Sequence, residues 1–186
     1  AAVVLNGFGK SVGLVQVDEL GLLETPIALT NTFSVGTVAT AQIRDCIASN
    51  PETGRALPTV NPLVFECNDG FLNDVQRMAV TEADYLQALQ GAGPDFAQGS
   101  VGAGRGMSSF GLKGGIGSAS RCVPAQDGVS SHTVGTLVLA NYGRQPQLLL
   151  AGQAVGDRLA ALQAARDAAD AAEDVPEKGS IIIVGA

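Results

Sequence analysis

Short apolar runs separated by polar or glycine-containing turns recur along the chain, and they predict several short strands. Residues 180–184 form the clearest run, because four β-branched residues follow Ser180 without a break. Strands are also predicted at 27–30, 63–65 and 133–140, and the leucine run at 148–150 is expected to pair with the last of these. The glycine-rich segment 99–120 is expected to hold two strands joined near residues 110–111.

Helical signals occupy three other segments. Between residues 38 and 47 apolar side chains recur at helical spacing, and the Asn-Pro pair at 50–51 ends the pattern because proline disfavours helical geometry in the residue before it. A threonine followed by acidic residues at 81–84 resembles a helix N-terminus, and Gly91 closes that helix. The alanine-rich segment 157–173 is expected to be a helix or a fraying helical linker. The order of elements predicts an α/β protein with helices outside its sheets.

Composition excludes several classes of partner. The chain has 186 residues, of which 46% are hydrophobic and 16% charged, which suits a globular domain and not a disordered segment. Its net charge is −7 and its 11 lysines and arginines are scattered, so no basic surface is available to neutralise phosphates, and nucleic acid is not an expected partner. The apolar runs are too short to cross a bilayer, so no membrane partner is expected either.

Several motifs with known chemistry are incomplete in this sequence. The Gly-Lys-Ser run at 9–11 lacks the glycine that a phosphate-binding loop needs five residues earlier, and the glycines at 102–106 miss the dinucleotide fingerprint. His132 is the only histidine, and no nucleophile elbow lies near it, so we interpret it as a turn residue between two strands. Three widely spaced cysteines offer no metal-ligand pattern, and no metal site is expected.

One junction near the end of the chain suits autoproteolysis. A polar segment runs directly into the strand predicted at 180–184, with Ser180 as its first residue. Gly179 has no side chain to shield its carbonyl, and glycine tolerates a strained backbone. The Ser180 hydroxyl can therefore attack this carbonyl to form an ester, and hydrolysis would leave Ser180 with an α-amine of pKa about 8 that can act as a base. A serine that merely begins a strand is the alternative interpretation.

Seven motif blocks lie in order along the chain: LNGFGKSVG at 5–13, ETPIALTNT at 24–32, NDGFLND at 68–74, GSVGAGRGM at 99–107, KGGIGSASR at 113–121, VLANYG at 138–143 and GSIII at 179–183. Together they resemble the L-aminopeptidase/D-Ala-esterase/amidase family of self-processing serine peptidases, and its β-aminopeptidase branch in particular. Residues 157–178 alone look idiosyncratic, as is typical of a tolerant linker before a cleavage point.

The resemblance implies a fold and a set of site residues. The fold would be a four-layer α/β/β/α sandwich of the N-terminal-nucleophile type, incomplete in this chain, and the precursor would cut itself between Gly179 and Ser180. Ser180 would then be the nucleophile, and the Asn141 side chain would donate to the oxyanion. Glu66 would pair with the free amino group of the substrate, and the backbone N–H of Asn68 would be a second oxyanion donor.

The resemblance also implies how the chain divides. Residues 1–186 are expected to be a single-domain fragment of a longer protein. Residues 1–179 would belong to the first subunit, with 157–178 as the linker before the cleavage point, and 180–186 would begin the second subunit. The fragment alone is expected to be inactive, because the family continues beyond it.

The implied function is the release of N-terminal amino acids, L-α or β, from short peptides, amides or esters through an acyl-enzyme on Ser180. No metal or organic cofactor is implied. The expected partners are these substrates, the rest of the precursor and further copies in a homo-oligomer of processed pairs, in the bacterial cytoplasm or periplasm. Two alternatives stay open: a self-processing acyltransferase like the ornithine acetyltransferases, whose threonine nucleophile differs from Ser180, and an inactive binding relative with the same fold.

Overall fold

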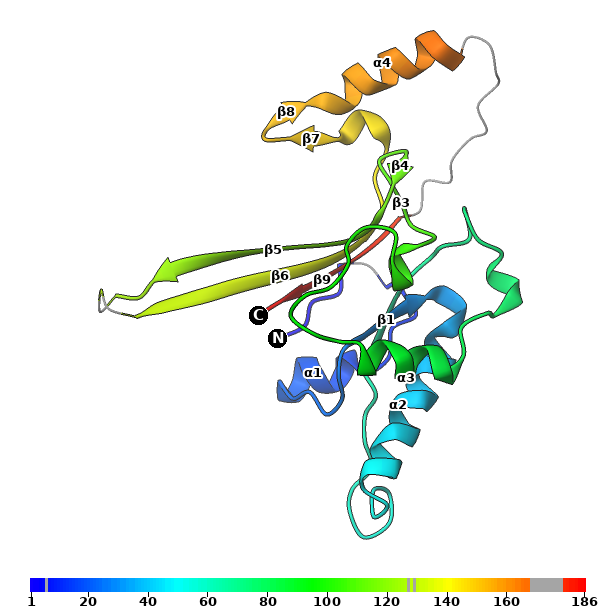
Figure 1. Cartoon of the computed structure of the whole chain (residues 1–186), viewed down its shortest axis with the longest axis vertical. Coiled ribbons are helices and arrows are strands. Elements are labelled where there is room, and N and C mark those ends of the chain that lie inside the picture. Colours follow the sequence, from blue (N-terminus) through cyan, green and yellow to red (C-terminus); the bar gives the residue numbers. More distant parts are fainter. Residues whose placement is uncertain (6, 127, 129, 168–178) are drawn as a thin grey trace. The chain divides into compact units, whose positions relative to one another are not determined.

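The computed structural model describes residues 1–5, 7–126, 128, 130–167 and 179–186. The chain forms two compact units, residues 1–97 and 98–186 (Figure 1). Both units combine helices with short sheets, so the protein is of the mixed α/β class. No helix in these described ranges has the length and apolar character that a membrane-spanning segment needs.

The first unit is built on a parallel strand pair. Strand β1 (Ala28–Asn31) pairs with β2 (Val64–Cys67) in a register that runs from Ala28 opposite Val64 to Asn31 opposite Cys67. Parallel strands need a long crossover, and here it contains the short helix η1 (Thr32–Ser34) and helix α2 (Val35–Ser49). The strands and the helix predicted from residues 27–51 and 63–65 are therefore confirmed.

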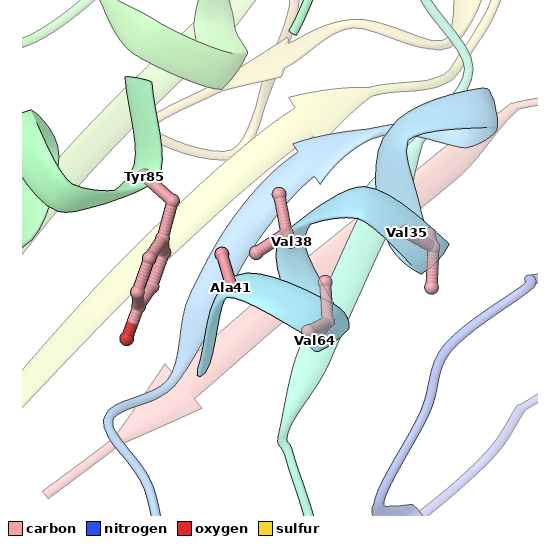
Figure 2. Close-up of a cluster of buried hydrophobic side chains, with 5 residues drawn as sticks. All are labelled: Val35, Val38, Ala41, Val64 and Tyr85. Carbon is pink, nitrogen blue, oxygen red and sulfur yellow. The ribbon is translucent and has the colours of Figure 1, made fainter. Parts of the chain in front are cut away.

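The core of this unit lies where α2 and the helix α3 (Glu82–Gln90) meet β2 (Figure 2). Its buried side chains are Val35, Val38, Ala41, Val64 and Tyr85. Helix α3 begins at a capping box: the Thr81 hydroxyl accepts from the Asp84 backbone N–H, and the Asp84 carboxylate accepts from the Thr81 backbone N–H. This confirms the helix start and stop predicted at 81–91.

Two further elements complete the first unit. Helix η2 (Val75–Arg77) follows the turn after β2. Helix α1 (Leu14–Leu20) was not expected from the sequence. It has only seven residues and buries none of them. Its apolar residues Leu14, Val17 and Leu20 recur at helical spacing, but the segment is shorter than the window of about 11 to 18 residues that a periodicity argument needs.

The second unit is built on a three-stranded antiparallel sheet. Strands β5 (Gly115–Pro124), β6 (Ser131–Asn141) and β9 (Ser180–Gly185) lie in the order β5-β6-β9 (Figure 1). The strands predicted at 133–140 and 180–184 are thus confirmed. The register between β6 and β9 ends with Asn141 directly opposite Ser180.

In the described part of this unit, two small hairpins and three helices accompany the sheet. The hairpins are β3 (Ser108–Ser109) with β4 (Leu112–Lys113) and β7 (Leu149–Leu150) with β8 (Gln153–Ala154). The helices are η3 (Gly102–Gly104), η4 (Gln145–Gln147) and α4 (Val155–Asp167). The β3–β4 hairpin turns at Phe110 and Gly111, as predicted, and both residues have positive φ, 54° and 70°. Two central residues with positive φ are what a tight hairpin of type I′ requires, and a phenylalanine adopts that conformation only when its surroundings hold it there.

Two sequence-based predictions in this unit are wrong. Residues 148–150 do not pair with the strand at 133–140, because β6 already has β5 and β9 on its two edges and β7 pairs locally with β8. His132 is not a turn residue: it lies within β6, opposite Val123 of β5. The helix predicted at 157–173 is present as α4 up to Asp167, and its last residues lie outside the described ranges.

Candidate functional site

The last residue of β6 and the first residue of β9 form a direct side-chain contact. The Asn141 amide nitrogen Nδ2 donates a hydrogen bond to Ser180 Oγ over 3.3 Å. Asn141 is only 8% exposed, so its amide is held within the protein. The two residues that the sequence selected as nucleophile and oxyanion donor are therefore brought together by the antiparallel register of this sheet.

A backbone group fixes the orientation of the Asn141 amide. The Ser108 backbone N–H donates to Asn141 Oδ1 over 2.9 Å. The oxygen of a side-chain amide only accepts hydrogen bonds and its NH₂ group only donates them. Because Oδ1 faces the Ser108 N–H, the NH₂ group of Asn141 is directed toward Ser180.

The β3–β4 hairpin also holds the residues just after Asn141. The Phe110 N–H donates to the carbonyl oxygens of Tyr142 and Gly143, both over 3.0 Å, and the Tyr142 N–H donates to Ser109 Oγ over 3.3 Å. The Phe110 and Tyr142 rings pack edge to face with centroids 5.1 Å apart. These contacts anchor the end of β6, and they account for the unusual backbone of Phe110.

Gly179 lies in a position that has no room for a side chain. A Cβ atom at this residue would lie 2.6 Å from both Cα and Cβ of Tyr142, well inside van der Waals contact. The backbone before Ser180 can therefore approach Tyr142 only because residue 179 is glycine. The rest of the predicted linker, residues 168–178, lies outside the described ranges.

Glu66 is a buried carboxylate in β2 of the first unit. It is 3% exposed and lies opposite Thr30 of β1. Its Oε1 accepts from the Lys10 backbone N–H over 3.0 Å, and its Oε2 accepts from the Thr32 hydroxyl. The loop that contains the Gly-Lys-Ser run at residues 9–11 thus contributes a backbone N–H donor to this carboxylate.

Asn68 lies on the exposed turn that follows β2. Its side-chain Oδ1 accepts from the Gly70 N–H over 2.9 Å, the arrangement of an Asx turn. Its neighbour Asp69 is buried at 5% exposure and accepts from the side-chain amides of Asn31, over 3.2 Å, and Asn73, over 2.9 Å. Glu66 and Asn68 belong to the first unit, and Asn141, Gly179 and Ser180 belong to the second.

Sequence reasoning missed two residues that shape the second unit's site. Ser108 acts through its backbone N–H, a group that every residue except proline has, so the residue type does not indicate this role. Lys113 donates from its ammonium group to three backbone carbonyls around the hairpin, and its presence at the head of the KGGIGSASR block was the only available hint. The roles of both residues depend on the fold, which brings the β3–β4 hairpin against the end of β6.

Known proteins resemble this chain over its whole length. The family model of peptidase family S58 matches residues 1–186, the whole chain. The β-peptidyl aminopeptidase BapA of Sphingosinicella microcystinivorans is 41% identical over 187 residues, which cover 96% of this chain and 46% of that protein. The chain therefore spans about half the length of the curated relatives it matches.

Two solved structures resemble the chain closely. The crystal structure of the PH0078 protein from Pyrococcus horikoshii OT3 is 44% identical with a TM-score of 0.85, over 98% of this chain and 47% of that one. The L-aminopeptidase D-Ala-esterase/amidase from Ochrobactrum anthropi, described as a new variant among the Ntn hydrolase fold, is 37% identical with a TM-score of 0.77, over 83% of this chain and 43% of that one. The α/β fold of N-terminal-nucleophile type expected from the sequence is confirmed. By its sequence and its fold, the chain belongs to peptidase family S58.

Proposed function

We propose that the full-length protein is a self-processing serine aminopeptidase whose nucleophile is Ser180. The observation that carries this proposal is the contact between Asn141 Nδ2 and Ser180 Oγ, at a serine that begins a strand directly after a sterically constrained glycine. The membership in peptidase family S58 and the aminopeptidase names of the relatives support the same assignment.

Self-cleavage would proceed in two balanced steps. Ser180 Oγ attacks the Gly179 carbonyl carbon, and the hydroxyl proton passes to the Ser180 nitrogen as the C–N bond breaks. The product is an ester between Gly179 and Ser180 Oγ with a free α-amine on Ser180. Water then hydrolyses this ester, which leaves a carboxylate on Gly179 and restores the hydroxyl of Ser180.

The processed enzyme would use the same serine on its substrates. An α-amine has a pKa of about 8, so at neutral pH it can exchange protons with the adjacent hydroxyl as the serine attacks. The amine or alcohol of the substrate leaves with a proton, and water releases the acyl group from Ser180. We assign to Asn141 the role of donor to the oxyanion that develops on the attacked carbonyl, with the Asn68 backbone N–H as a second donor.

We infer that the substrates are short peptides, amides or esters with a free amino end, of L-α or β type. The relatives are a β-peptidyl aminopeptidase and an L-aminopeptidase, and in this chain the buried Glu66 is the group we assign to the substrate's ammonium. Self-cleavage would make the rest of the precursor the permanent partner of residues 1–179. Assembly of several processed pairs into one homo-oligomer is part of the same proposal.

Intact-mass analysis of the purified full-length protein tests this function. We expect two pieces whose masses sum to that of the precursor plus one water, with the second piece beginning at Ser180. The processed protein should then release the amino acid from an aminoacyl p-nitroanilide. An unbroken chain without hydrolysis would contradict the proposal and favour an inactive binding relative, whereas acetyl transfer to glutamate would favour an acyltransferase.

Replacement of Glu66 by Gln should weaken the binding of substrates that carry a free amine. A hydrogen bond to a charged group contributes about 1.5–3 kcal/mol, so KM should rise about 10- to 100-fold. The same anilide without its amino group should be cleaved equally by the wild type and by E66Q. Glu19→Gln, which removes an exposed carboxylate from α1 of the same unit, is the matched control. A parallel loss on both substrates would assign Glu66 to folding instead.

A further inference from the structure

Lys113 is held by backbone carbonyls at the base of the β3–β4 hairpin. Its Nζ donates to the carbonyl oxygens of Gly104, over 2.8 Å, Met107, over 2.9 Å, and Gly114, over 2.9 Å. An ammonium group has three N–H donors, and these three acceptors satisfy all of them. Gly104 and Met107 precede β3 and Gly114 follows β4, so one cation joins the two ends of the hairpin.

Lys113 is an exposed residue of β4, but its ammonium is bound by backbone carbonyls and is not left to solvent alone. Within the described part of the chain no carboxylate forms a salt bridge with Lys113, and its hydrogen-bond partners are main-chain oxygens. Desolvation by the surrounding chain lowers the pKa of Lys113 from its usual value, which agrees with an ammonium that is partly withdrawn from water.

The contact with Met107 leads directly to Asn141. The Met107 carbonyl and the Ser108 N–H belong to the same peptide group, which is planar and rigid. The oxygen of this group accepts from Lys113 Nζ and from the Gly114 N–H, both over 2.9 Å, while its N–H donates to Asn141 Oδ1. A cation on the oxygen of a peptide group also polarises its N–H and strengthens it as a donor.

We propose that Lys113 is a positioning residue for the Asn141–Ser180 pair: its ammonium fixes the Met107–Ser108 peptide group, whose N–H orients the Asn141 amide. The catalytic consequence of this inference rests on the proposed function, whereas its structural consequence rests on the hydrogen bonds of Lys113 and Ser108 alone. Lys113 itself does not contact Ser180 in this arrangement. Its effect passes through one peptide group and one side-chain amide.

Lys113→Met in the full-length protein tests the proposal, because methionine keeps most of the aliphatic stem and removes the donors. A small misplacement of a catalytic group can cost about 10²-fold, so kcat should fall about 10- to 100-fold while KM changes less than about twofold. Self-cleavage should slow by a similar factor. Arg121→Met is the matched control and should leave kcat unchanged, because among the described residues the Arg121 guanidinium donates only to the carbonyl of its neighbour Ser120.

Coupling to Asn141 distinguishes positioning from general stabilisation. If Lys113 acts through Asn141, adding K113M to Asn141→Ala should lower kcat by less than about twofold beyond N141A alone. If the decrease in kcat of the double variant equalled the product of the two single decreases, the proposal would be overturned. A K113M protein whose kcat matches that of R121M would overturn it as well. A K113M protein without a cooperative unfolding transition would assign the lysine to folding and would also overturn it.

Two further measurements keep the test decisive. Lys113→Gln, a shorter neutral side chain with two N–H donors, is the milder variant and should lower kcat about 10-fold while KM stays unchanged. A wild-type kcat in this variant would overturn the proposal.

Amide hydrogen exchange measures the protection of the Ser108 N–H and does not depend on catalysis. This protection should fall about 10-fold or more in K113M. Unchanged protection in K113M would refute the proposal that Lys113 fixes this peptide group. If the wild-type protein were inactive but K113M still lowered the protection of the Ser108 N–H, only the proposed function would be refuted.

Discussion

Replacement of Ser180 by Ala in the full-length protein is expected to abolish both chain cleavage and substrate hydrolysis. Both reactions begin with attack by the same hydroxyl, so one substitution should remove them together. Removal of the nucleophile of a serine hydrolase lowers kcat by a factor on the order of 10⁶, and the purified variant should give a single unbroken mass. Intact-mass analysis and anilide hydrolysis measure the two losses on one sample.

The substitution should leave the fold intact, because Ser180 is only partly buried and its strand is held by the backbone register with β6. Ser120→Ala removes an exposed serine from β5 of the same sheet and is the matched control for stability and activity. Ser180→Cys supplies a different nucleophile at the same place and should retain partial cleavage. An S180A protein that still splits before residue 180 would disprove the proposed cleavage chemistry.

The sequence predicted the parts of the fold that depend on local patterns. The capping signal at Thr81, the apolar run after Ser180 and the turn at Phe110 each depend on neighbouring residues, and each is present in the structure. Periodicity cannot choose a strand's partner, however. The leucines at 148–150 carry a strand signal, yet Ala151 and Gly152, both with positive φ, turn them back onto Gln153 and Ala154.

The sequence predicted which side chains form the candidate site, but not the backbone groups that orient them. Ser180 and Asn141 were selected from the motif blocks, and the structure adds that they face each other across two strands. The group that orients Asn141 is a backbone N–H, and the group that fixes this N–H is a lysine whose partners are carbonyl oxygens. Backbone donors and acceptors are present at almost every residue, so a sequence cannot reveal which of them a fold uses.

Replacement of Asn141 is expected to have the second largest effect. Removal of one oxyanion donor lowers kcat by about 10²–10³-fold, and N141A should show a loss of this size in hydrolysis and slower self-cleavage. N141A also leaves the Ser108 N–H without its acceptor, which should lower the free energy of unfolding by about 1–3 kcal/mol. Stopped-time intact-mass analysis follows the cleavage, and denaturant unfolding measures the stability.

Asn141→Asp separates these two effects, because aspartate has the same size and keeps an oxygen for the Ser108 N–H. It removes the NH₂ donor that faces Ser180, and it adds a negative charge where the oxyanion would develop. In N141D the Ser108 N–H should therefore keep hydrogen-exchange protection close to that of the wild type, while kcat falls at least as far as that of N141A. If N141D kept wild-type activity, the amide nitrogen of Asn141 would have no part in the chemistry, and its contact with Ser180 would be structural.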